Sequence, residues 1–258
     1  NSYHFHFRHP LLTDKRVRQA LIHAIDRDNI LRTLYSDSYV KGSSILARTA
    51  VGYKDQSGNY DFDPEQSRHL LEEAGWTPGE DGIRVKDGTR LSLTFNESVP
   101  QPRSREMFTK VQEMLKNIGV EAHLYPGDRT AQDKAIKDQD SVQVRHSMVG
   151  RANVDTLATW INGEGRNSFL NYDAESDSYG DTKLQDMVEE YFSLRSEKER
   201  LDMSGRMQDY LSDQAYILPL FEEPQVYGFQ PSVEGFTTEA IGRPSFYAVE
   251  INADEGRK

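Results

Sequence analysis

The 258-residue sequence contains no cysteine. A thiol nucleophile, a zinc site with cysteine ligands and a disulfide framework are therefore excluded. Long apolar runs are missing as well. Residues 216–221 form the longest one and Pro219 interrupts it, whereas a transmembrane helix needs about 20 apolar residues. The opening residues NSYHFHF alternate like a strand and are no signal peptide, so we expect a piece of a longer protein.

Clusters of basic residues are also absent, because no run of Lys or Arg is longer than two and the net charge is -11. Binding to nucleic acid depends on clustered Lys and Arg that neutralise phosphates. Attachment to an anionic membrane surface needs the same kind of charge. The sequence therefore predicts a protein with no nucleic-acid partner.

Motifs of common enzymes do not occur either. The sequence has no Gly-x-Ser-x-Gly, no phosphate-binding Walker loop and no His-Glu-x-x-His. Residues 163–168, GEGRNS, lack the third glycine of a dinucleotide-binding loop. We expect a binding protein that is not an enzyme and has no cofactor, with an α/β enzyme or an interaction module as the second alternative.

What the sequence does contain is enough apolar material for a core: 36% hydrophobic and 10% aromatic residues. Segments with strand and helix periodicity alternate along the chain, which predicts an α/β fold. The length suits one large domain or two small ones.

The first two predicted helices carry clear signals. Residues 16–26 should form a helix capped by Thr13 or Asp14, with one apolar stripe. That stripe consists of Val17, Ala20, Leu21, Ala24 and Ile25. A second helix should start at Asp63, with Pro64 in its first turn, and stop at Gly75.

The remaining elements follow from periodicity. Residues 91–125 predict a strand, a helix and a second strand parallel to the first. Val142 and Val144 indicate a short strand, and two helices should span 182–194 and 197–214. We expect paired strands at 217–221 and 225–229, and single strands at 3–8 and 246–251.

Four stretches, in order, carry a resemblance to a known family. They are PLLTDKRVRQALIHAIDR (10–27), YDFDPEQSRHLLEEAGW (60–76), MLKNIGV (114–120), and AYILPLF (215–221) followed by VEGF (233–236). Together they resemble the bacterial extracytoplasmic solute-binding proteins of family 5, which serve peptide and nickel ABC transporters.

The resemblance implies a lobe of the type II periplasmic-binding-protein fold, with a central mixed sheet flanked by helices. Residues 1–258 would be the second, C-terminal lobe, with 1–9 and 246–258 as segments crossing to a missing N-terminal lobe. The implied function is extracytoplasmic binding of an oligopeptide-like solute and its delivery to an ABC permease in the membrane. The protein would reside in the periplasm or as a lipoprotein on the cell surface. Nickel or a metal chelate is the alternative ligand.

The loop at 150–155 is the strongest candidate for ligand contact, since it follows a predicted strand of an α/β sheet. The resemblance implies an aspartate here that pairs with the amino terminus of a peptide, at Asn153 or Asp155. Arg151 is a candidate for clamping a carboxylate, and Trp160 for walling the pocket. A solvated loop and a core tryptophan are the alternative interpretations.

Two oxygen- or nitrogen-rich groups are weaker candidates for metal sites. His4 and His6 lie on one face of the first predicted strand, and His9 follows. Asp55, Asn59, Asp61 and Asp63 lack the spacing of a calcium loop. We therefore expect no metal site. A last expectation concerns the chain's ends: as crossing segments, residues 3–8 and 246–251 should pair with each other.

Overall fold

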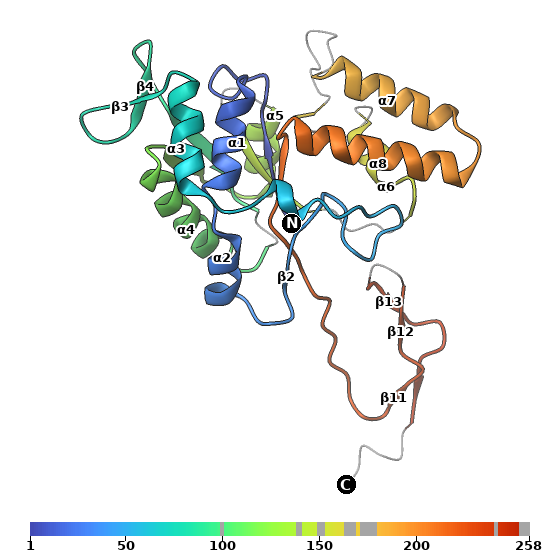
Figure 1. The fold of residues 1–258 in the computed structure, drawn as a ribbon. Coiled ribbons are helices and arrows are strands. Elements are labelled where there is room, and N and C mark those ends of the chain that lie inside the picture. Colours follow the sequence, from blue (N-terminus) through green and yellow to red (C-terminus); the bar gives the residue numbers. More distant parts are fainter. Residues whose placement is uncertain are drawn as a thin grey trace.

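The computed structural model describes residues 1–98, 101–137, 141–148, 153–162, 169–170, 180–239 and 242–252. A mixed sheet with strand order β7-β6-β8-β1-β9 forms its centre, with helices on both faces (Figure 1). The strands are β1 (Ser2–Phe5), β6 (Ser92–Asn96), β7 (Glu121–Tyr125), β8 (Val144–Ser147) and β9 (Ile217–Pro219). The expected α/β architecture with a central mixed sheet is confirmed.

The helices form two groups. Those of the first half are α1 (Lys15–His23), α2 (Arg27–Leu34), α3 (Pro64–Glu73), a 3-10 turn (Ser57–Asn59) and α4 (Ser104–Asn117). Those of the second half are α5 (Arg129–Lys137), α6 (Thr156–Ile161), α7 (Thr182–Ser193) and α8 (Glu197–Asp213). Of these, α2, α5 and α6 were not predicted from the sequence.

Short strands pair outside the central sheet. A meander consists of β3 (Thr77–Pro78), β4 (Arg84–Lys86) and β5 (Thr89–Arg90), and β2 (Val40–Lys41) pairs with β10 (Phe221–Glu222). Towards the C-terminus, β11 (Val233–Glu234) pairs with β14 (Glu250–Ile251), and β12 (Thr237–Thr238) with β13 (Pro244–Ser245). Residues 223–239 and 242–252 belong to an extended arm that leaves the helices and sheet and turns back on itself (Figure 1).

Strand β1 separates two apolar cores. Tyr3 and Phe5 point into the core that α1, α3 and α4 cover, while His4 packs on Trp160 of α6 on the opposite face. This is the alternation that the sequence predicted. The strand ends at Phe5, however, so the prediction of a strand over 3–8 was too long. Phe7 stacks on Tyr216, with ring centroids 4.2 Å apart, in the second core.

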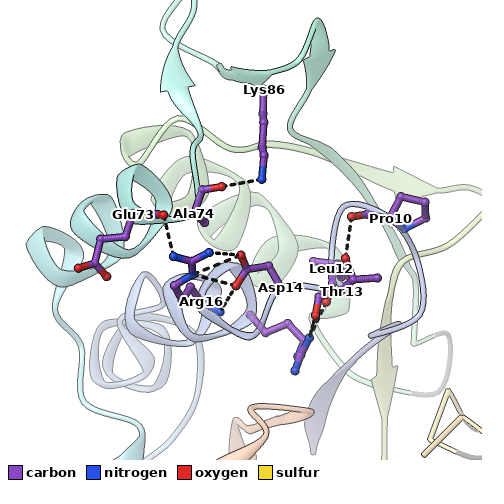
Figure 2. A network of polar contacts seen from close by, with 9 residues as sticks. Pro10, Leu12, Thr13, Asp14, Arg16, Glu73, Ala74 and Lys86 are labelled. Carbon is purple, nitrogen blue, oxygen red and sulfur yellow. Dashed lines mark hydrogen bonds and ion pairs between the residues drawn. The ribbon is translucent and has the colours of Figure 1, made fainter.

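Helix α1 ends at His23, so the predicted helix over 16–26 was too long, but the whole predicted stripe is buried, with Ala24 and Ile25 following the helix. The start of α1 is tied to α3. Asp14 caps the helix by accepting a hydrogen bond from the Arg16 backbone nitrogen at 2.9 Å. Figure 2 shows the Arg16 guanidinium between the Asp14 carboxylate and the Glu73 carbonyl oxygen, which it reaches at 2.7 Å. Lys86 donates to the next carbonyl oxygen, that of Ala74. The end of α3 is thereby held against the start of α1.

Helix α3 and the unit β6–α4–β7 begin and end close to where the sequence predicts. Asp63 caps α3 by accepting from the Gln66 backbone nitrogen, Pro64 begins the helix, and Gly75 ends it with φ +86. Strands β6 and β7 are parallel and α4 connects them, as predicted. The left-handed backbone of Gly119, φ +83, turns the chain from α4 into β7.

The predicted pairing of 217–221 with 225–229 is wrong. Strand β9 pairs antiparallel with β1, and β10 pairs with β2. Residues 225–229 form no strand. The competing partners are distant in sequence, and periodicity alone does not identify which strand a short apolar segment will join.

The predicted pairing of the two end segments is also wrong. Strand β1 lies between β8 and β9, so both of its edges are already hydrogen-bonded. Only Glu250–Ile251 of the expected strand 246–251 is extended in a ladder, and it pairs with β11 inside the arm. An inner strand has no free edge to offer, and that excludes the pairing.

Arg27 fixes the position of the segment after β2. Its buried guanidinium donates to the carbonyl oxygens of Gly42, Tyr60 at 2.6 Å and Pro219 at 2.8 Å. Gly42 itself lies so close that an added Cβ would stand 3.0 Å from the Pro219 Cβ. Arg27 thus binds the loop after β2 to the end of β9.

We predict that Arg27→Lys lowers the free energy of unfolding by about 2–4 kcal/mol, because a single ammonium cannot satisfy three separated carbonyl oxygens. Urea unfolding measures the change. Arg32→Lys, a substitution at an exposed position of the same helix, should leave the free energy of unfolding within about 0.5 kcal/mol of the original. Equal midpoints for both variants would contradict the role of Arg27.

Candidate functional site

The carboxyl ends of four strands, β6, β7, β8 and β9, lie at one edge of the central sheet. Strand β8 is parallel to β6, β1 is antiparallel to β8, and β9 is antiparallel to β1. The ends of β6, β8 and β9 therefore meet the start of β1. From β6 the chain passes through α4 to β7 on one side, whereas β8 lies on the other. Such a reversal of strand order is where open α/β sheets bind ligands.

A cavity of about 500 Å³ opens at this edge. Its walls come from the start of β1, from β2 and the loop after it, from Met148 after β8, from β10 and the beginning of the arm, and from the turn between β12 and β13. The principal lining residues are Asn1, Ser2, Ser44, Arg48, Met148, Phe221, Glu222, Glu223 and Glu239. Its size is within the range of small-molecule and peptide sites.

The wall beside β10 holds an ion pair and a second carboxylate. The Arg48 guanidinium lies 3.4 Å from the Glu222 carboxylate, which also accepts from the Arg48 backbone nitrogen at 3.1 Å. The adjacent Glu223 accepts a hydrogen bond from the Asn1 side-chain amide at 3.4 Å. Glu239 on the arm adds a third carboxylate. Among the lining side chains, acids thus outnumber bases.

Neither Asn153 nor Asp155 is among the residues lining this cavity. Asn153 accepts a hydrogen bond from the Thr156 hydroxyl at 2.7 Å, at the start of α6. The Asp155 carboxylate accepts from the Tyr191 hydroxyl at 2.7 Å and from Arg200 at 3.3 Å. These contacts join α6 to α7 and α8. Arg151 lies outside the described residues.

Trp160 is buried and is not among the residues that line the cavity. His4 and Ser2 connect it to the cavity. Its indole meets the His4 imidazole edge-on, with ring centroids 4.7 Å apart. The His4 Nε2 lies 2.9 Å from the Ser2 hydroxyl, and Ser2 lines the cavity. The structure thus places Trp160 in the core, one of the two alternatives left open by the sequence.

The buried histidines stay neutral in the folded chain. Burial, with Arg145 nearby, lowers the pKa of His4 well below its ordinary value, and burial lowers that of His6 to about 4. Burial also lowers the pKa of His146 to about 3; its Nε2 lies 3.2 Å from the Asn1 side-chain oxygen. Within the described ranges, no group of three or more His, Asp or Glu side chains is arranged to hold a metal ion.

Sequence reasoning missed the loop after β2 and the pair Glu222–Glu223. The loop, residues 42–49, has neither helical nor strand periodicity. The two glutamates follow directly on the AYILPLF stretch, and two acids after a buried apolar run were the available signal.

In the described part of the chain, no helix has the length and apolar character needed to span a membrane.

Comparison with known proteins identifies the family. The family model of the bacterial extracellular solute-binding proteins, family 5 (middle region), matches residues 1–167. A dipeptide-binding protein of Escherichia coli K12 is 23% identical over 248 residues, which cover 93% of this chain and 43% of that protein.

Solved structures show the same fold at low sequence identity. NikA from Brucella suis in complex with Fe(III)-EDTA matches with a TM-score of 0.74 and 20% identity, over 97% of this chain and 50% of that one. The oligopeptide-binding protein AppA from Bacillus subtilis in complex with a nonapeptide matches with a TM-score of 0.71 and 18% identity, over the same shares. The chain spans half or less of the length of these relatives, and its match to the family model shows that it belongs to the bacterial extracellular solute-binding proteins, family 5.

Proposed function

We propose that this chain is the second lobe of an extracytoplasmic solute-binding protein that binds an oligopeptide-like solute and delivers it to an ABC permease. The cavity at the carboxyl edge of the sheet carries the proposal, because it is where a chain of this fold would contact a ligand. Membership in a solute-binding family supports binding without catalysis. The described residues provide one wall of a site, and a second lobe would close it.

The proposed second lobe also accounts for the arm. Phe246 and Ile251 are 69% and 74% exposed, and Val226, Phe229 and Tyr247 are exposed as well. Phe229, Phe246 and Ile251 line one apolar hollow of the arm, and an exposed apolar surface of this kind is costly in water and marks an interaction site. We propose that residues 1–9 and 246–258 cross between the lobes and that the arm packs against the N-terminal lobe, in the half of the relatives that this chain does not cover.

The proposed ligand contacts of Arg151, Asn153, Asp155 and Trp160 remain predictions. For Asp155 the contacts with Tyr191 and Arg200 add a structural role, so Asp155→Ala should lower the free energy of unfolding by about 1–2 kcal/mol besides any loss of binding. Urea unfolding measures this loss. Asp37→Ala, which removes a carboxylate at an exposed position, is the control and should leave the midpoint unchanged. An unchanged midpoint for Asp155→Ala would contradict the structural role.

Nickel or a metal chelate is a second candidate ligand, favoured by the fold's likeness to NikA in complex with Fe(III)-EDTA. The described residues hold no group of three metal ligands, so the form of this candidate that they support is a chelate that brings its own ligands. The cavity would then recognise the outside of the chelate.

Native mass spectrometry of the gently purified natural protein separates these candidates. We expect the folded protein to carry an additional mass equal to that of a short peptide, released when the protein is unfolded. A metal-containing mass would favour the chelate. A protein that carries no solute and binds none from a peptide mixture would contradict the proposed function.

A further inference from the structure

The cavity contains a carboxylate that no Lys or Arg of the described residues pairs with. Glu222 is paired with Arg48, as described above. Glu223 has the neutral Asn1 side-chain amide within hydrogen-bond distance, at 3.4 Å, and the α-ammonium of Asn1 attracts it without forming an ion pair. A ligand cation in direct contact with this carboxylate would add a charge-assisted hydrogen bond, in a cavity whose lining acids outnumber its bases.

Aromatic rings stand next to this carboxylate. Phe221, which lines the cavity, packs on Tyr35 and Tyr39 with ring centroids 4.8 and 5.6 Å apart. Tyr35 and Tyr39 in turn lie 4.5 Å apart. Of the three rings only Phe221 is among the residues that line the cavity. Aromatic rings attract ammonium and guanidinium groups, so Phe221 and Glu223 favour the same kind of ligand group.

We propose that the solute carries a basic group, an ammonium or guanidinium of the lysine or arginine type, and that the Glu223 carboxylate holds it in the cavity. This inference rests on the proposed function, because it assigns the charge of the peptide side chain that the site selects. An acidic side chain at the same place would meet Glu223 and Glu239 and be repelled.

The test is calorimetric binding of three matched peptide series to the natural full-length protein. Each series consists of alanine peptides of two to five residues in which one position is Lys, Gln or Glu. The backbone termini are the same in all series, so differences report the side chain alone. We expect the best Lys peptide to bind about tenfold or more tighter than its Glu counterpart.

Two variants assign the effect to the carboxylate. Glu223→Gln should weaken binding of the Lys peptide about tenfold and leave the Gln peptide within about twofold. Glu234→Gln removes the same charge from an exposed position that does not line the cavity, and should change neither.

Equal affinities for the Lys and Glu series in the unaltered protein would overturn the inference while leaving peptide binding intact. So would an unchanged preference in Glu223→Gln. Failure of all three series to bind would instead reject the peptide-binding function together with the inference. The comparison in the unaltered protein does not depend on any variant folding.

Discussion

Acidification from pH 7 to pH 4.5 will lower the free energy of unfolding of this chain by about 5 kcal/mol. In the folded chain burial lowers the pKa of His6 to about 4 and that of His146 to about 3, whereas both return to about 6.5 on unfolding. Between these values the unfolded chain binds more protons. The stability contributed by neutral burial is therefore complete above pH 6.5 and is lost as the pH falls.

The magnitude follows from proton linkage. Each histidine contributes about 1.4 kcal/mol per pH unit over the two units from 6.5 to 4.5. The pKa of His4 is lowered in the same direction and adds to the loss. Since small domains are stable by about 5–15 kcal/mol, the chain should approach its unfolding transition at pH 4.5.

Urea unfolding at pH 7.0, 5.5 and 4.5 measures the effect. His6→Phe keeps an aromatic ring stacked on Phe169, whose ring centroid lies 4.7 Å from that of His6. The loss of unfolding free energy between pH 7.0 and pH 4.5 should then be smaller by the contribution of one histidine. His69→Gln removes an exposed histidine of α3 that lies 3.2 Å from Glu73, and should change the pH dependence much less than His6→Phe, because exposed ion pairs contribute little. The same steep dependence in all three proteins would show that buried histidines do not cause it.

Leu21→Asp should abolish folding of the chain. Leu21 is 1% exposed and lies in the middle of the α1 stripe, within the core formed with α3 and β1. The substitution removes a packed side chain and buries a carboxylate without a partner, at a cost of about 5 kcal/mol or more. Loss of the thermal transition in circular dichroism is the expected observation.

Gln19→Asp, on the outer face of the same helix, is the matched control. It introduces the same residue type into α1 at a half-buried position, and should cost about 1 kcal/mol. A soluble Leu21→Asp protein with an unchanged melting temperature would refute the packing of α1 described here.

Local signals predicted the elements whose ends the sequence itself encodes. Asp14 and Asp63 cap α1 and α3, and Gly75 and Gly119 end helices with left-handed backbones. The parallel pairing of β6 and β7 followed from a strand, a helix and a strand in succession. In each case the deciding interactions lie within a few residues or follow from the handedness of one crossover.

Strand partners and the site depend on distant residues and could not be predicted in this way. Strand β1 takes its neighbours from residues 139 to 145 and 213 to 217 positions away. Asp155 has a loop-like sequence context, yet Tyr191 and Arg200, which are distant in sequence, both donate hydrogen bonds to its carboxylate. The cavity combines segments from both ends of the chain, so no local pattern identified Glu223 as part of it.

Hydrogen exchange of the natural protein, with its co-purified solute and after removal of that solute, tests the central claim most directly. The account predicts that the solute protects backbone amides of residues 40–49 and 221–225, which line the cavity, because closure buries them. The outer faces of α7 and α8 should not change. Protection confined to α7 and α8, or none at all with the solute bound, would contradict a binding site at the carboxyl edge of the sheet.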